Sequence, residues 1–314
     1  MAIDSSLSAA LAAIVGAERL REQSPLAGLT TFRVGGPADY LVDVHSPREL
    51  VEVLAAARRH GAAVTMLGGG SNVLIADAGV RGVVVRLRLM ELTQPASDTV
   101  RAGAGVTMNG LVRWTIGRGL AALEAWAGTP GTVGGAIYGN AHYGGRSIGD
   151  LVTRVQLMTR DGVTAEVAAG DMRFAYDTSR LQQTRELLVW AEFHVRPGLT
   201  DQLRTVARAS LAHRKRTQPL DVPSAGCVFQ NPDPLRDRIP EGVPASAGAL
   251  VDRVGLKGHR VGGAMISSAH ANFIVNDRHA TAADIHTLIE TARKAVRQQF
   301  GVELRDEVVR LGEF

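Results

Sequence analysis

Three consecutive glycines, in the sequence Gly68-Gly69-Gly70-Ser71-Asn72, constrain the fold of this chain more than any other feature. They follow a short apolar run, Val64 to Leu67, which predicts a buried strand. Glycine lets successive backbone N–H groups point toward one place, with no Cβ to keep out a bulky anion. Because a plain surface turn does not need the entropic cost of three glycines, we interpret the segment as a cradle for a pyrophosphate.

This glycine segment differs from the common nucleotide-binding motifs. It does not have the G-x-G-x-x-G spacing of dinucleotide-binding folds, and no lysine follows it as in the P-loop of nucleoside triphosphatases. The sequence therefore indicates neither of those two classes of site.

A second glycine-rich run is Gly128-Thr129-Pro130-Gly131-Thr132-Val133-Gly134-Gly135. It could be a flexible linker, but proline and the branched side chains stiffen it and it interrupts an apolar region. We expect a second loop that lies close to a ligand. The run Thr31-Phe32-Arg33-Val34-Gly35-Gly36 is either a similar loop or a simple lead-in to the next strand.

Apolar periodicity and turn residues predict the order of helices and strands. A capping box, from Ser46 to Glu49, is expected to open one helix. An antiparallel pair is expected at 152–159 and 187–195, beyond a turn at Asp161-Gly162. The remaining strands are predicted at 38–44, 64–67, 82–87, 272–275 and 302–311, and the helices at 1–23, 47–60, 108–117, 201–216, 247–254 and 281–300.

Composition limits the class of protein. A chain of 314 residues is long enough for two or three domains, and 45% hydrophobic residues allow a substantial core. Aromatic residues at 4% and a net charge of only +4, spread along the chain, argue against nucleic acid and favour a small anionic ligand. We expect no metal site. We also expect no membrane insertion, because no apolar run has the length of a membrane span. We expect a cytoplasmic location, because the single Cys227 needs no oxidising compartment and no signal peptide is recognisable.

Two reactive side chains stand in distinctive surroundings. Cys227 lies beside glycine and two amide side chains in Gly226-Cys227-Val228-Phe229-Gln230-Asn231-Pro232, although a lone cysteine is usually a small buried hydrophobe. Glu307 lies in a predicted strand, where a carboxylate is most often simply solvated. From the residues alone, each of the two side chains could be either functional or merely structural.

Taken in order, these motifs resemble the UDP-N-acetylenolpyruvoylglucosamine reductase (MurB) family. The resemblance covers about residues 29 to 312. Six family patterns have a match in this chain. T-F-x-x-G-G matches Thr31 to Gly36, G-G-G-S-N matches Gly68 to Asn72, and P-G-T-x-G-G matches Pro130 to Gly135. G-S/C-x-F-x-N-P matches Gly226 to Pro232, H-A-N-F-I-x-N matches His270 to Asn276, and P/D-E-V matches Asp306 to Val308.

The resemblance implies an α+β fold. An FAD-binding region of the vanillyl-alcohol-oxidase (PCMH) type, in two subdomains, would precede a C-terminal α+β substrate-binding domain. The expected division is an N-terminal helix at 1–28, FAD-binding subdomains at 29–88 and 89–198, the substrate-binding domain at 199–301, and a C-terminal strand at 302–314 that returns to the active site.

It also implies an activity with FAD and NADPH as cofactors. NADPH would reduce the flavin, and hydride would then pass to the enolpyruvyl ether of UDP-N-acetylglucosamine, giving UDP-N-acetylmuramate for peptidoglycan. By the same resemblance Cys227 is the proton donor and Glu307 supports the intermediate. FAD would be held by Gly68, Gly69, Gly70, Ser71, Asn72, Pro130, Gly131, Thr132, Gly134 and Gly135, and the substrate by Tyr176, Arg214, Gln230, Asn231 and Asn272.

The chain departs from the family pattern at three places. The family's F-x-Y-R-x-S reads Phe174-Ala175-Tyr176-Asp177-Thr178-Ser179, so an acid replaces the arginine that pairs with the substrate carboxylate. We expect Arg173 or Arg180 to screen that acid. The segment Asn140-Ala141-His142-Tyr143-Gly144 is one residue shorter than the common N-A-G-A-Y-G, and Gln230 replaces a frequent lysine.

The absence of a long insertion after Ser179 matches the shorter class of the family, which lacks a tyrosine-bearing lid loop. Two other functions stay open. One is a related FAD-dependent oxidase of another sugar or hydroxy acid, and the other is a flavin-binding homologue with weakened catalysis. The sequence does not determine the oligomeric state.

Overall fold

The computed structural model describes residues 3–314, which divide into two compact units. Unit 1 contains residues 3–24, 38–69 and 81–213, and unit 2 contains residues 25–37, 70–80 and 214–314. The glycine segment is therefore shared: Gly68 and Gly69 belong to unit 1, and Gly70 to Asn72 belong to unit 2. The five-part division expected from the sequence stays a prediction.

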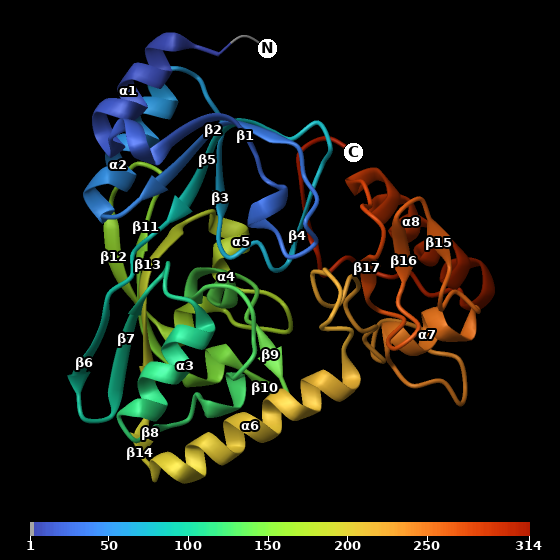
Figure 1. The fold of residues 1–314 in the computed structure, drawn as a ribbon. Coiled ribbons are helices and arrows are strands. Elements are labelled where there is room, and N and C mark those ends of the chain that lie inside the picture. The colour runs from blue at the N-terminus through green and yellow to red at the C-terminus, as the bar shows by residue number, and fades with distance from the viewer. Residues whose placement is uncertain (1–2) are drawn as a thin grey trace. The chain divides into compact units, whose positions relative to one another are not determined.

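Unit 1 is built from two main sheets and the helices that cover them (Figure 1). Its helices are α1 (Ser5–Val15), α2 (Pro47–Arg59), α3 (Met108–Gly117), α4 (Val133–Tyr138), α5 (Arg180–Thr184) and α6 (Thr200–Thr217), which continues into unit 2 from Arg214. Its main strands are β1 (Leu20–Pro25), β2 (Pro37–Val44), β3 (Val64–Leu67), β5 (Val80–Leu87), β6 (Leu92–Ala96), β7 (Thr99–Gly103), β11 (Val152–Met158), β12 (Thr164–Ala168) and β13 (Leu187–His194). Short strands are β8 (Leu120–Ala121), β9 (His142–Tyr143), β10 (Arg146–Ser147) and β14 (Arg196–Pro197).

The first sheet has the order β1-β2-β5-β3, with β3 and β5 parallel. Figure 1 shows α1 and α2 together over this sheet, where their apolar faces, including Leu11 and Leu50, share a core with Val42. The second sheet has the order β12-β11-β13-β7-β6, with antiparallel neighbours throughout. The antiparallel pairing predicted for the segments that became β11 and β13 is confirmed.

The start of α2 differs from the expected capping box. The Ser46 hydroxyl accepts a hydrogen bond from the Glu49 N–H at 3.2 Å, as predicted. The Glu49 carboxylate, however, accepts from the His45 N–H and from both terminal nitrogens of Arg19, at 2.8 and 3.0 Å, instead of returning to Ser46. The predicted return bond from the Glu49 side chain to the Ser46 N–H is therefore wrong. The physical reason is that a bidentate guanidinium is a stronger partner than one backbone N–H.

Two other segments are shorter than predicted. The N-terminal helix ends at Val15, because Gly16 has a φ of +86° and the chain then enters β1; Met1 and Ala2 lie outside the described residues. The predicted strand at 302–311 is regular only in β18 (Val309–Leu311). Val302 and Leu304 have the alternating burial of a strand. Among the described residues, however, this stretch forms only one β-bridge before β18, between Asp306 and Phe229.

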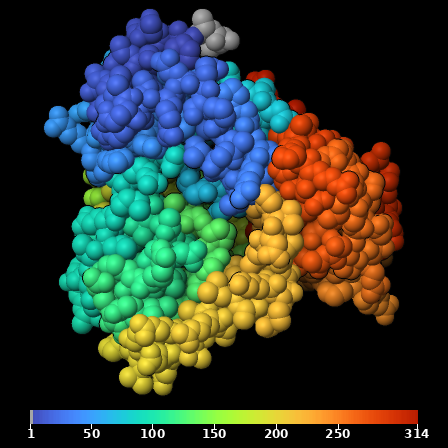
Figure 2. Space-filling view, viewed as in Figure 1, coloured from blue at the N-terminus to red at the C-terminus, as the bar shows by residue number. Residues whose placement is uncertain are grey.

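Unit 2 packs two helices on a small antiparallel sheet, β15-β16-β17. Figure 2 shows its residues from about 250 to 300 gathered into one body, coloured orange to red. The longest helix buries Ile285, Leu288, Ile289 and Ala292 at helical spacing and ends at Gly301, where φ is +69°. The elements are β4 (Val73–Ile75), α7 (Ala247–Arg253), β15 (Arg260–Val261), β16 (Ala264–Ile266), β17 (Ile274–Asn276), α8 (Ala282–Phe300) and β18.

The segment 70–80 is tied into unit 2 by backbone and side-chain bonds. β4 pairs in parallel with β18. After β4, the Asp77 carboxylate accepts hydrogen bonds from the N–H groups of Ala282 and Ala283, at 2.8 and 2.9 Å, in the first turn of α8. One side chain thus fixes the position of this loop and satisfies two unpaired donors of the helix.

We expect Asp77→Ala to lower the free energy of unfolding by about 1 kcal/mol, the usual cost of losing a helix-capping acceptor. Urea unfolding followed by circular dichroism measures the change. Glu241→Ala, at an exposed loop position of the same unit, is the control and should be neutral. Equal stability of the Asp77 variant and the wild type would show that the cap contributes nothing.

Candidate functional site

The two glycine loops lie against each other within unit 1. A Cβ at Gly69 would lie 2.6 Å from the Cα of Gly131 and 3.3 Å from the backbone nitrogen of Thr132. A Cβ at Gly68 would lie 2.9 Å from the Thr132 hydroxyl oxygen. Since the neighbours of Gly69 are backbone atoms that cannot rotate away, glycine is required there.

The second loop is held in place by backbone hydrogen bonds and is not a flexible linker. Met108 donates its N–H to the Gly131 carbonyl at 3.0 Å, and Gly134 donates to Ala104 at 2.9 Å. Gly68, Gly69 and Gly135 are exposed between these fixed points. This exposed, rigid surface without side chains fits a pyrophosphate such as that of FAD.

The remaining part of the glycine segment belongs to unit 2. Gly70 has a φ of +64°, and a Cβ there would lie 1.9 Å from the Leu29 carbonyl oxygen. The Asn72 amide donates to the Glu307 carbonyl at 3.0 Å, and the Asn72 carbonyl accepts from the Val309 N–H at 3.0 Å. The end of the glycine segment therefore fixes the backbone that carries Glu307.

The Thr31 to Gly36 run also belongs to this framework. Thr31 donates its N–H to the Gly70 carbonyl at 2.9 Å. A Cβ at Gly36 would lie 2.0 Å from the Asp77 carbonyl oxygen, so this glycine allows the close packing of two loops. The run supports the glycine segment within unit 2.

Cys227 and Glu307 lie on neighbouring segments of unit 2. Cys227 forms a single β-bridge with Phe273, and the next residue, Val228, accepts a hydrogen bond from the Glu307 N–H at 2.9 Å. Cys227 is half-buried and follows Gly226, whose φ is +83°. The fold thus brings a thiol and a carboxyl residue together from parts of the sequence far apart. Their catalytic roles stay a prediction.

The amide of Asn272 holds this arrangement together. Its oxygen accepts from the Phe229 N–H at 3.0 Å and its nitrogen donates to the Phe229 carbonyl at 2.8 Å, while the side chain is 2% exposed. Asn231 accepts from the Ala247 N–H at 3.1 Å, and Gln230 is half-buried beside it. Asn272 and Asn231 therefore position backbone, and the substrate contacts expected of all three stay predictions.

The two other expected substrate residues belong to different units. Tyr176 lies in unit 1, in a tight turn closed by paired hydrogen bonds between Ala175 and Thr178, and is 47% exposed. Arg214 lies in unit 2, near the end of α6, and is 7% exposed. Contact of either side chain with a substrate stays a prediction.

The partner of Asp177 is a histidine that sequence reasoning missed. The His142 Nδ1 atom lies 3.0 Å from the Asp177 Oδ1 atom. Arg180, which we expected to screen Asp177, instead binds Glu186 at 2.8 and 3.1 Å. Both His142 and Asp177 lie in segments that depart from the family pattern, and that coincidence was the available signal for their pairing.

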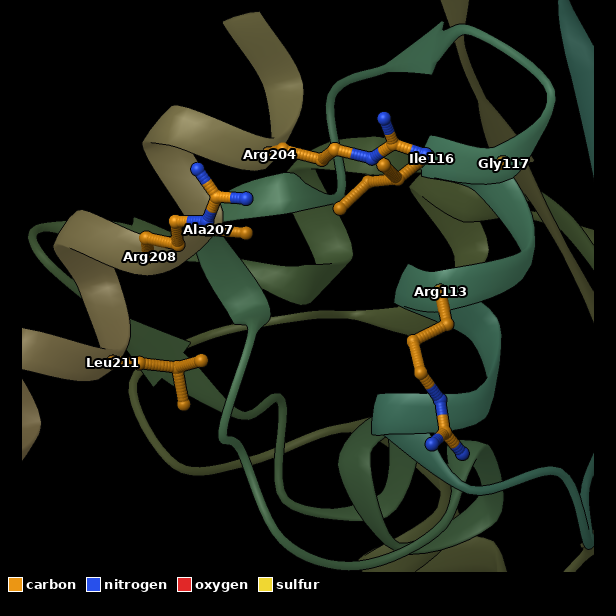
Figure 3. Close-up of a pocket in the computed structure, with 7 residues that line it drawn as sticks. All are labelled: Arg113, Ile116, Gly117, Arg204, Ala207, Arg208 and Leu211. Atoms are coloured by element: carbon orange, nitrogen blue, oxygen red, sulfur yellow. The ribbon is translucent and has the colours of Figure 1, made fainter. Parts of the chain in front are cut away.

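A groove of about 280 Å³ lies between α3 and α6 in unit 1 (Figure 3). Three arginines, Arg113, Arg204 and Arg208, line it, but Figure 3 shows the Arg113 side chain extending away from the other two. Arg204 also pairs with Asp201 at 3.1 Å. The guanidinium groups do not converge, so the groove does not form an anion site.

Within residues 3–314, no cluster of three or more His, Cys, Asp or Glu side chains is arranged to hold a metal ion. No helix in that range has the length and apolar composition needed to cross a membrane.

The buried His270 makes the stability of unit 2 depend on pH. Burial is the main cause that lowers its pKa, with a smaller effect from Lys257. Its neutral ring accepts a hydrogen bond from the Asn272 N–H at Nδ1, at 3.2 Å, and packs against Phe273. The folded state therefore resists protonation of His270, whereas the unfolded chain takes up the proton near pH 6.5.

We expect this contribution to stability to be complete above about pH 6.5 and to be lost as the pH falls through the lower folded-state pKa. Thermal unfolding at pH 7.5 and 5.5 measures it. His270→Gln should show a smaller fall in Tm between these pH values than the wild type does. His259→Gln, at an exposed position of the same unit, should keep the wild-type fall. An unchanged pH dependence in His270→Gln would contradict the assignment.

Comparison with known proteins agrees with this geometry. Residues 38–168 match the model of an FAD binding domain, and residues 218–311 match that of the UDP-N-acetylenolpyruvoylglucosamine reductase C-terminal domain. The UDP-N-acetylenolpyruvoylglucosamine reductase of Anaeromyxobacter sp. is 44% identical, over 96% of this chain and 91% of the relative. The protein of the same name from Synechococcus sp. strain JA-3-3Ab is 40% identical, over 94% and 92%.

Among solved structures, UDP-N-acetylenolpyruvylglucosamine reductase (MurB) from Thermus caldophilus aligns with a TM-score of 0.77 at 32% identity. The alignment covers 93% of this chain and 100% of that one. The expected α+β fold, with an FAD-binding region before a C-terminal domain, is confirmed by these matches. The chain belongs to the UDP-N-acetylenolpyruvoylglucosamine reductase (MurB) family.

Proposed function

We propose that this protein reduces the enolpyruvyl ether of UDP-N-acetylglucosamine to UDP-N-acetylmuramate, a precursor of peptidoglycan, with NADPH as reductant and FAD as bound cofactor. Membership of the reductase family supports this activity. The observation that carries it is the connection made by residues 68–72. They begin at the glycine cradle of unit 1 and end at Asn72, which fixes the Glu307 segment beside Cys227 in unit 2.

The residues that would hold FAD are Gly68 to Asn72 and Pro130 to Gly135. When bound, FAD supplies the redox chemistry, because it can accept hydride from NADPH and pass it to the methylene carbon of the enolpyruvyl group. The rigid backbone of the two loops lets the pyrophosphate approach without steric hindrance from a Cβ.

Cys227 and Glu307 would complete the reaction. Hydride addition to the methylene carbon leaves negative charge on the carbon next to the substrate carboxylate, in an enediolate-like species. The Cys227 thiol donates its proton to that carbon, and the resulting thiolate regains a proton from solvent. Glu307 supports the charged species from the adjacent segment. A thiol suits the task because it is far more acidic than a serine hydroxyl.

The partners of this reaction are small molecules, a UDP-sugar and NADPH. We further infer a cytoplasmic location. The presence of a single cysteine, which cannot form a disulfide within the chain, and the use of nucleotide substrates support it.

We expect Gly69→Ala to reduce bound FAD at least tenfold, because its Cβ would displace the backbone of Gly131. The flavin absorbance of the purified protein, relative to protein concentration, measures occupancy. Gly117→Ala is the matched control, since a Cβ at that helical position meets no atom within 4 Å, and it should keep full flavin content. Full occupancy in Gly69→Ala would disprove the cradle.

We expect Cys227→Ala to slow flavin reoxidation by the enolpyruvyl substrate by about a hundred- to ten-thousand-fold, the usual contribution of a general acid. Stopped-flow absorbance separates this step from bleaching of the flavin by NADPH, which should stay near the wild-type rate. Cys227→Ser should keep much of the activity.

Reoxidation at the wild-type rate in Cys227→Ala would refute the role of the thiol.

The same flavin measurements on the wild-type enzyme test the proposed function itself. If another sugar or hydroxy acid reduces the flavin and oxygen reoxidises it, while the enolpyruvyl substrate does not react, the protein is an oxidase. If none of these substrates reacts, it is a flavin-binding protein with weakened catalysis.

A further inference from the structure

We propose that Arg293, on α8, is a positioning residue for the proposed reaction. It holds residues 304–307, the segment that carries Glu307, against residues 227–230, the segment that carries Cys227. This inference rests on the proposed function, because it concerns the arrangement of the two residues expected to act in that reaction. Arg293 acts through the two segments and not by contact with substrate or flavin. Every residue in the argument belongs to unit 2.

Few backbone bonds join the two segments. Glu307 donates its N–H to the Val228 carbonyl at 2.9 Å, and Gln230 donates its N–H to the Arg305 carbonyl at 2.9 Å. An isolated β-bridge lies between these two bonds. Because so short a pair of strands is weak by itself, side-chain contacts from outside the pair are needed to fix the crossing of the segments.

Arg293 contacts both segments. Its Nε atom donates to the Leu304 carbonyl at 3.1 Å, and one terminal nitrogen donates to the Asp306 carboxylate, so it holds the chain just before Glu307. The guanidinium carbon also lies 5.7 Å from the centre of the Phe229 ring, within the range of a cation–π contact. That ring is only 1% exposed and is therefore fixed in the core of unit 2. One side chain thus ties the Glu307 segment to the Cys227 segment.

Arg293 is itself held in a closed ring of four charged side chains. Glu290 and Asp306 each use one oxygen for Arg293 and the other for Arg310, and both bonds to Arg310 are 2.7 Å long. The two positive and two negative charges balance within the ring. A single ion pair near the surface contributes little to stability, but a closed network restricts all its members at once. The ring therefore fixes Asp306, the neighbour of Glu307.

The same helix offers a matched control one turn further on. Arg297 pairs only loosely with Glu303, at 3.4 Å, and its side chain is 72% exposed, whereas that of Arg293 is 19% exposed. Arg297→Met removes one positive charge from α8 without touching the ring. Arg293→Met removes the same charge together with every bond of the guanidinium. Arg293→Lys keeps the charge but loses the planar fork that reaches several acceptors.

The first measurement is stopped-flow reoxidation of the NADPH-reduced, FAD-loaded protein by the enolpyruvyl ether of UDP-N-acetylglucosamine. Arg293→Met should slow this step by about ten- to a hundredfold, because a small displacement of reacting groups has an effect of that size. Arg293→Lys should slow it by a smaller factor. Bleaching of the flavin by NADPH should stay near the wild-type rate in both variants, since that step uses neither Cys227 nor Glu307. Arg297→Met should match the wild type in both steps.

The second measurement needs no substrate. Cys227 is the only cysteine of the chain, so the rate of alkylation by iodoacetamide reports on its segment alone. Arg293→Met should be alkylated about fivefold faster than the wild type, because a segment that loses one stabilising contact opens more often by a factor of this order. Arg297→Met should be alkylated at the wild-type rate.

Three results would overturn the proposal. If the enolpyruvyl substrate reoxidises Arg293→Met at the wild-type rate, Arg293 has no positioning role. Equal slowing of flavin reduction and flavin reoxidation, or equal effects of Arg293→Met and Arg297→Met, would mean a general effect on the fold. If the substrate does not reoxidise the wild type, the proposed function fails and the positioning role fails with it. Faster alkylation of Arg293→Met would then show that the contacts of Arg293 are structural only.

Discussion

Close approach of backbone to backbone at residues 68–70 is the constraint on which the rest of this structure depends. In unit 1, Gly69 packs against Gly131 at a distance that excludes a Cβ, and in unit 2, Gly70 packs even more closely against Leu29. No side chain could be accommodated at either contact. Glycine at these positions costs conformational entropy, and at Gly69 it leaves an exposed backbone surface.

The chemistry of unit 2 depends on a second constraint, which is the satisfaction of buried polar groups. Asn272 is almost fully buried, and both ends of its amide bond the backbone of Phe229. Without these bonds, the segment that carries Cys227 would leave its own backbone groups unpaired. The segment that carries Cys227 is therefore positioned by the Asn272 amide, and His270 in turn accepts a hydrogen bond from the backbone N–H of Asn272.

The charged residues at positions 142 and 177 differ from those of the family pattern. An arginine carries its own positive charge, whereas this chain has an acid at that position and a histidine in a shortened neighbouring segment. The acid is buried and the histidine is more accessible, so the histidine is the member of the pair nearer to solvent. Asp177 and His142 both depart from the family pattern, and in the folded chain each is the other's partner.

Local patterns by themselves determined much of this protein. Apolar periodicity identified α3 and α8 closely, and the glycine and proline motifs, taken in order, indicated both the FAD-binding fold and the family. Only the tertiary structure decided what depends on a distant partner. Arg19 takes Glu49 from its expected capping box, the stretch before β18 pairs at a single residue, and His142 rather than Arg180 meets Asp177. The physical reason is that periodicity and caps act within a few residues, whereas ion pairs and sheet partners are selected by which segments the folded chain brings together.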